Sequence, residues 1–90
     1  MMIQYAKNDI SDGIKLLSIG IGNIVVAIVR KELSEYTLDM PMDYFLMTGA
    51  LRKMFPGIDI RYSDNSMIIL IESTLIRISF KEDNTVFSLI

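Results

Sequence analysis

The side chains best suited to acid–base chemistry in this sequence are carboxylates, because the chain contains no His and no Cys. A carboxylate acts as a general acid or base at neutral pH when burial raises its pKa. Only Glu72, at the end of an apolar run, is a candidate for such burial, and an exposed strand end is the commoner setting. No Ser has a His to activate it. The sequence therefore predicts no catalytic residue and no enzymatic activity.

Metal and cofactor sites are not predicted either. Without Cys and His the usual ligands of zinc are missing. Residues 9–13 (DISDG) contain two acids and a glycine of the kind found in calcium loops, but the further ligands and the closing Glu are absent. The pair Gly20 and Gly22 does not continue into a phosphate-binding motif. We expect no metal and no cofactor.

One pattern that favours binding is an acidic stretch without an intervening Lys or Arg, made of Glu32, Glu35, Asp39 and Asp43. If these carboxylates share a face, they would suit a basic protein partner, such as the nucleic-acid-binding surface of another protein. The alternative is a solvated connection that ends in helix-capping charges. Capping and helix-dipole preferences favour this alternative.

A second pattern lies in residues 39–55, which are predicted to form a helix that Pro56-Gly57 ends. Asp39 is expected to cap this helix, with Pro41 in its first turn and Asp43 near the positive end of its dipole. At 100° per residue its apolar face comprises Tyr44, Leu46, Met47, Ala50, Leu51, Met54 and Phe55. The helix is therefore predicted to pack on a sheet through that face.

Four residues fall on the side of this helix away from the apolar face: Met42, Phe45, Gly49 and Arg52. Aromatic and Arg side chains anchor many interfaces, Met suits adaptable surfaces, and Gly permits close approach. The alternatives are that the helical phase is off by one position, or that a loop covers Phe45. We expect these four residues, with the acidic stretch, to bind a protein partner.

The segments after the helix are predicted to form an antiparallel meander of four strands: residues 58–63, 67–71, 75–81 and 85–90. Polar pairs such as Asp64-Asn65 and Ser73-Thr74 are expected to turn the chain between them. The run at 67–71 is apolar at every position, which predicts a central strand covered on both faces.

The segments before the helix are also predicted to be mainly strands. Residues 2–7 are expected to form an edge strand, 8–13 a turn, and 14–21 and 24–32 a hairpin about Gly22-Asn23. A helix with Val25, Val26, Val29 and Leu33 along one line is the alternative. β-Branched residues occupy five of positions 24–29 and favour the strand.

The whole chain, residues 1–90, is thus predicted to be a single α+β domain with a mostly antiparallel sheet of five to six strands and one helix. Hydrophobic residues make up 51% of it, more than so small a domain can bury, so a subunit or partner interface is expected and a homodimer is favoured. The apolar run at 16–29 is too short to span a bilayer, and we expect no membrane association.

Charge and composition narrow the function class. The formal net charge is −2 and the Lys and Arg residues are scattered, so direct nucleic-acid binding is not expected. The absence of Cys fits a reducing, cytoplasmic compartment. These features are typical of small non-enzymatic inhibitors or immunity-type proteins, including viral ones made by bacteriophages. The alternatives are an assembly subunit that forms a homo-oligomer and a small-ligand-binding domain.

Overall fold

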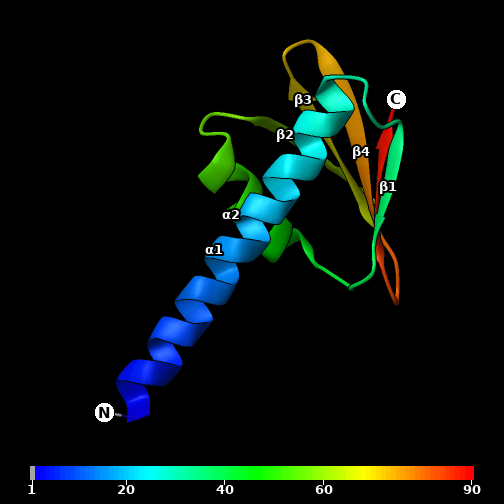
Figure 1. Cartoon of the computed structure of the whole chain (residues 1–90). Helices are drawn as coiled ribbons and strands as arrows, with labels where there is room; N and C mark the ends of the chain where they lie inside the picture. The colour runs from blue at the N-terminus through cyan, green and yellow to red at the C-terminus, as the bar shows by residue number, and fades with distance from the viewer. Residues whose placement is uncertain (1) are drawn as a thin grey trace.

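The structure is a computed structural model that describes the chain from residue 2 to residue 90, with the side chains of residue 13 and of residues 15–90. Its two helices and five-stranded antiparallel sheet form an α+β fold, as predicted (Figure 1). In chain order the elements are α1 (Met2–Val29), β1 (Glu35–Leu38), α2 (Tyr44–Met54), β2 (Asp59–Ser63), β3 (Ser66–Ile71), β4 (Thr74–Phe80) and β5 (Thr85–Leu89).

The strand order across the sheet is β1-β5-β4-β3-β2, and every neighbouring pair is antiparallel. Strands β2 to β5 form the meander expected from the alternating sequence and the short polar turns. Strand β1 was not predicted, because its four residues lie in the acidic stretch. It pairs with the last strand, with Glu35 opposite Ser88 and Leu38 opposite Thr85.

The expectation for the first third of the chain is wrong, because residues 2–29 form one helix, α1. The predicted edge strand (2–7), turn (8–13) and hairpin (14–21 with 24–32) all fall within α1 or the turn that follows it. The β-branched residues of the run favoured a strand, but a continuous apolar run does not distinguish a central strand from a buried helix. Packing of α1 against α2 and the sheet outweighs the intrinsic preference.

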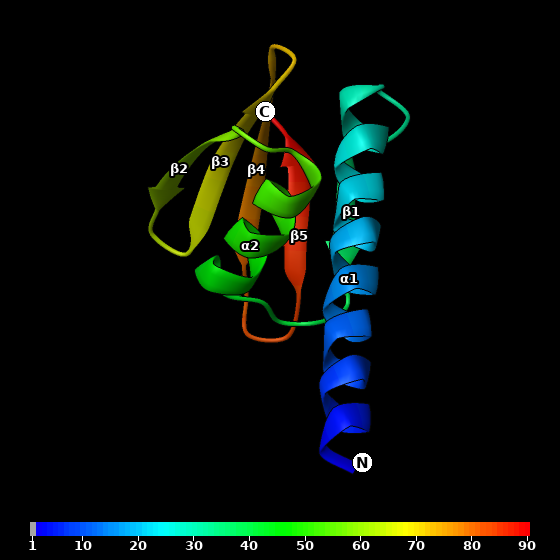
Figure 2. The ribbon, with the colours of Figure 1, turned by 90° about the vertical axis from the view of Figure 1, so that its left-hand side faces the viewer.

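Both helices lie on the same face of the sheet (Figure 2). In the core between them and the sheet, Ile21, Val25 and Ile28 of α1 are buried with Met47 and Leu51 of α2. The sheet contributes Met67, Ile69, Ile76, Ile78 and Phe87. Neither helix, over the residues that the structure describes, is long and apolar enough to cross a membrane.

The two helices approach closely at Gly22 of α1. A Cβ at this position would lie 2.9 Å from the Met54 Cε atom and 3.3 Å from its Cγ atom, closer than side chains normally pack. The missing side chain of Gly22 therefore makes room for Met54 of α2.

Helix α1 ends in a Schellman motif. The N–H of Glu32 donates to the carbonyl of Ala27 (2.9 Å), and the N–H of Lys31 donates to the carbonyl of Ile28 (3.0 Å). Lys31 closes the motif with a φ of 64°, in the left-handed region that favours glycine.

We expect Lys31→Gly to stabilise the protein by roughly 1 kcal/mol, because glycine adopts this left-handed conformation without the steric cost that Lys bears. The matched control is Lys15→Gly, in which an exposed Lys inside α1 is replaced. It should destabilise by about 1 kcal/mol, since glycine is a poor helix former. Urea unfolding of the two variants measures both changes, and a destabilised Lys31→Gly variant would contradict the motif.

Helix α2 begins later than predicted, at Tyr44, and Asp43 rather than Asp39 is its N-cap. The Asp43 Oδ1 atom accepts a hydrogen bond from the Leu46 N–H at 2.9 Å. The predicted end is confirmed, with two basic residues in the last turn and Pro56-Gly57 after the helix. The core stripe is narrower than expected, because Leu46 is 47% exposed.

Strand β3 is central, as predicted, because it pairs with β2 on one side and β4 on the other. The expectation that both its faces are covered is wrong. Ile69 is fully buried beneath the helices, whereas its neighbour Leu70 is 42% exposed on the open face of the sheet. The turn that follows is formed by Glu72 and Ser73, both at positive φ, and not by Ser73-Thr74.

Candidate functional site

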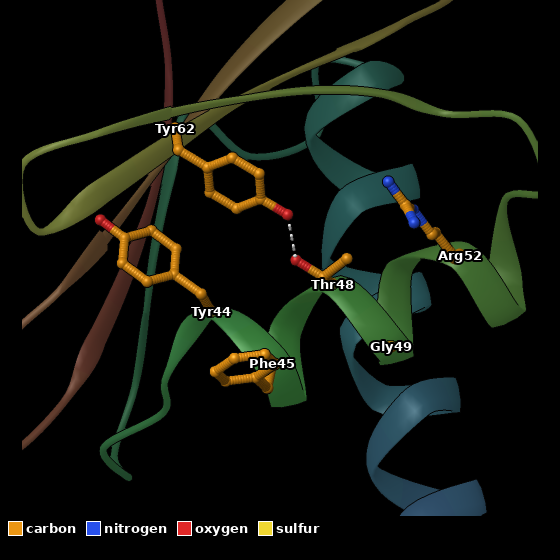
Figure 3. A pocket seen from close by; sticks show the side chains of 6 residues that line it. All are labelled: Tyr44, Phe45, Thr48, Gly49, Arg52 and Tyr62. Carbon is orange, nitrogen blue, oxygen red and sulfur yellow. Dashed lines mark hydrogen bonds between the residues drawn. The ribbon is translucent and has the colours of Figure 1, made fainter.

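A hollow of about 750 Å³ lies between α2 and the edge strand β2 (Figure 3). Five residues of α2 line it, and four of them (Phe45, Thr48, Gly49 and Arg52) are spaced three or four apart and so share one side of the helix. Tyr62 of β2 and Tyr44, at the first position of α2, complete the lining. The six residues are Tyr44, Phe45, Thr48, Gly49, Arg52 and Tyr62.

Tyr44 is held by contacts on two sides. Its hydroxyl donates a hydrogen bond to the backbone carbonyl of Ser63, at the end of β2. Its ring packs edge to face against Tyr62 (centroids 5.1 Å apart) and against Phe80 (5.0 Å). The aromatic wall of the hollow is therefore fixed to both the helix and the sheet.

A second link joins α2 to β2 across the hollow. The hydroxyl oxygens of Thr48 and Tyr62 lie 2.8 Å apart and share a hydrogen bond (Figure 3). With the Tyr44 contacts, this bond ties α2 to the exposed edge of the sheet. The hollow is thus formed in the unliganded chain, and a partner does not have to order its walls.

Phe45 and Arg52 lie at opposite ends of the hollow, two helical turns apart along α2 (Figure 3). The side chain of Phe45 is 89% exposed, the largest exposed fraction among the large hydrophobic residues that the structure describes. Arg52 is also exposed. Gly49, between them, has no atom near its Cβ position, so a partner could approach the backbone there.

The lining supplies apolar, hydrogen-bonding and charged groups. Three aromatic rings offer apolar area and ring faces, three hydroxyls offer hydrogen bonds, and Arg52 offers a guanidinium group that pairs with a carboxylate or a carbonyl. The lining contains no carboxylate and no amine that could act as a base on the hydroxyls.

A smaller groove of about 200 Å³ runs along the other side of α2, between that helix and α1. Phe45 and Gly49 border this groove as well as the hollow, so the exposed ring of Phe45 separates the two depressions. Leu17 of α1 and Leu46 of α2 are among the residues that line it.

Three of the four residues predicted on this side of the helix come together in the hollow: Phe45, Gly49 and Arg52. Met42 does not. It precedes α2 and is only 7% exposed, packed in the core, so its expected exposure is wrong. The predicted helix began about one turn too early. Met42 was therefore placed on the exposed side of a helix that in fact starts after it.

Three lining residues were not predicted as site residues. Tyr44 was assigned to the core face of the helix, and Thr48 was not singled out. Tyr62 belongs to β2, and its approach to α2 depends on the tertiary fold. The sequence signal that could have found Tyr62 was its place as an aromatic residue on a strand with one polar face.

The acidic stretch does not form one compact patch. Glu32 precedes β1, Glu35 lies in it, and Asp39 and Asp43 follow it, all exposed. The two ends of this segment lie at opposite ends of β5, because the Leu89 N–H donates to the carbonyl of Ser34 while the Thr85 hydroxyl donates to that of Met40. Asp43 acts as a helix cap, which is the alternative that capping preferences favoured.

The other candidates for chemistry stay apart. Glu72 is exposed in the turn between β3 and β4. Over the residues that the structure describes, no group of three or more His, Cys, Asp or Glu side chains is arranged to hold a metal ion.

Comparison with known proteins returned no match among protein-family models, curated proteins or solved structures.

Proposed function

We propose that this chain is a non-enzymatic binding protein that uses the hollow between α2 and β2 to occupy a surface of a protein partner. The proposal rests mainly on the exposure of Phe45, whose side chain is 89% exposed on a capped helix. Burying a Phe side chain on binding contributes roughly 1.5–3 kcal/mol. Aromatic residues are enriched at the cores of protein interfaces.

The lining defines the chemistry of the partner segment. An apolar side chain would pack against the rings of Tyr44, Phe45 and Tyr62. A carboxylate or a C-terminal carbonyl of the same segment would pair with Arg52 at the other end. The effect on the partner is steric, because the occupied surface is no longer available to other molecules. Inhibitor and immunity-type proteins act in this way.

A small-molecule ligand is the second candidate. A volume of about 750 Å³ falls within the range of roughly 300–1,000 Å³ that is usual for ligand pockets. The position at the rim of the fold, with Phe45 directed away from the core, favours the protein partner.

The test compares three proteins in pull-downs from the native host: the wild type, the double variant Phe45→Ala with Arg52→Ala, and the control Arg77→Ala. Arg77 is exposed on β4, on the open face of the sheet away from both helices. We expect a protein captured by the wild type and the control to be lost with the double variant.

The captured protein is then purified and titrated against all three. Two interface anchors, each contributing more than 1 kcal/mol, should weaken the affinity of the double variant by roughly 100-fold. Its thermal unfolding should match the wild type, because both side chains are exposed. Equal affinity of all three proteins would place binding elsewhere, and a large loss of stability would place Phe45 in the core.

A further inference from the structure

The open face of the sheet, turned away from both helices, carries an apolar patch. Over the described part of the chain, no other element lies on this face (Figures 1 and 2). Ile68 and Leu70 of β3 and Leu75 of β4 occupy it, and the two leucines are 42% and 44% exposed. Leu70 and Leu75 are register partners, and the N–H of the 56% exposed Ile90 donates to the carbonyl of Leu75. These four residues therefore adjoin one another across three strands.

Strand β3 departs from the pattern expected of a sheet with one face in water. Such a sheet normally alternates apolar residues on the core side with polar residues on the other side. In β3 the positions on the open face are instead filled by Ile68 and Leu70. A strand that is apolar on both sides is typical of a sheet covered on both faces. The sequence of β3 thus indicates a second covering layer, which the described chain does not supply.

Two opposite charges border the patch on the edge strand β2. Asp59 is the register partner of Leu70, and Arg61 is the register partner of Ile68. Both charged side chains are exposed, and with three apolar residues of the patch they line a groove of about 210 Å³. The open face therefore carries two adjacent rows of side chains across the strands. One row begins with an acid, the other begins with a base, and both continue into apolar residues.

We propose that the open face packs against the same face of a second copy of the chain, in a two-fold dimer. The argument for a second copy is that the two rows complement each other. A two-fold axis across the strands, midway between the rows, lays each row on the other row of the second copy. Arg61 then meets Asp59 of the second copy, and Ile68 meets Leu70. Opposite charges meet at the rim and apolar residues at the centre, as in most protein interfaces.

The other symmetric arrangement is disfavoured by charge. An axis along the strands keeps each row over itself, and centred on the middle strand β4 it sets Arg77 against Arg77 of the second copy. Like charges in these positions repel. With the axis across the strands, Arg77 lies over Leu75 of the second copy. Its methylene groups can cover that leucine while the guanidinium group stays in water.

The dimer also accounts for a property of the whole chain. Hydrophobic residues make up 51% of it, more than a two-layer fold of this size needs for its core. Stacking two sheets face to face provides the missing layer on β3. The hollow between α2 and β2 lies on the helix side of the sheet, so the dimer and the proposed binding site use separate surfaces.

The first test is the mass in solution, measured by sedimentation over a wide range of concentrations. The wild type should shift from the 10.3 kDa monomer to twice that mass as its concentration rises. Leu70→Asp should associate roughly 100-fold more weakly, because each copy would place an unpaired carboxylate in the apolar centre. The matched control is Leu46→Asp, the same replacement at a 47% exposed leucine on α2, which should dimerise like the wild type.

The second test exchanges the charges on β2. Asp59→Arg sets bases against bases of the second copy, and Arg61→Asp sets acids against acids. Each variant alone should therefore dimerise roughly 10-fold more weakly than the wild type. A mixture of the two variants restores both opposite-charge pairs, so they should form a heterodimer about as readily as the wild type forms its dimer. An effect confined to one chain would not be rescued by mixing.

Three results would overturn the proposal. The first is a wild type that stays at 10.3 kDa at every concentration, which would leave the open face to a different partner. The second is equal dimerisation of Leu70→Asp and Leu46→Asp. The third is a mixture of the two charge variants that associates no better than either variant alone. The Phe45→Ala and Arg52→Ala variant should dimerise normally, so failure of the dimer and failure of the binding hollow are told apart.

Discussion

Replacing Ile69 with Asp should unfold the protein. Ile69 lies in the central strand β3, beneath the helices, with no exposed surface. A carboxylate there would have to be buried without a partner or be protonated, at a cost of several kcal/mol. A small domain has only about 5 kcal/mol of stability, so the folded state should be lost at room temperature. Circular dichroism and urea unfolding measure the result.

The matched control is Leu70→Asp, one position along the same strand. Leu70 is 42% exposed on the open face of the sheet, so its replacement leaves the new carboxylate in contact with water. We expect this variant to stay folded and to lose about 1 kcal/mol or less. If both variants unfold, the open face is covered by something in solution. If neither does, the placement of β3 in the core is wrong.

Phe87→Ala should give the second largest effect, a loss of about 3–5 kcal/mol. Phe87 is the largest of the fully buried side chains that the structure describes, and it lies in β5 between β1 and β4. The substitution removes the apolar contacts of the ring and leaves a cavity in the centre of the core. Urea unfolding at constant m-value measures the loss directly.

Phe45→Ala is the control for this substitution, because it removes the same atoms from an 89% exposed position. Its stability should lie within about 0.5 kcal/mol of the wild type. A Phe87→Ala variant that is as stable as Phe45→Ala would mean that the core does not close around β5 as the structure has it.

The C-terminal half of the fold was predictable from the sequence, and the N-terminal third was not. Strands β2 and β4 largely alternate polar and apolar residues, and short polar turns separate the strands of the meander, so period and turn chemistry agree. For α1 two other signals disagree. The β-branched residues favour a strand, whereas the spacing of the apolar residues from Ile10 to Ile28 is helical. The apolar spacing was the better predictor, because it marks the face of the helix that packs on the rest of the fold.

The candidate site was predicted in part. The side of α2 that carries Phe45 and Arg52 follows from helical periodicity alone, and it is exposed as expected. The hollow itself was not predictable in this way, because Tyr62 comes from a strand whose distance from α2 is set by the fold. Met42 was misplaced because a helix start depends on which Asp caps it, and the sequence offers two.

The strand order also decides how the sheet meets other sheets. Its two unpaired edges are β1, which has only four residues and begins with Glu35, and β2, which exposes Asp59 and Arg61. Short strands and charged side chains at an edge disfavour the addition of a foreign strand, which is how natural β-proteins avoid fibrous aggregation. Although half of the residues in this chain are hydrophobic, the edges of its sheet therefore disfavour edge-to-edge polymerisation and favour closed, specific contacts.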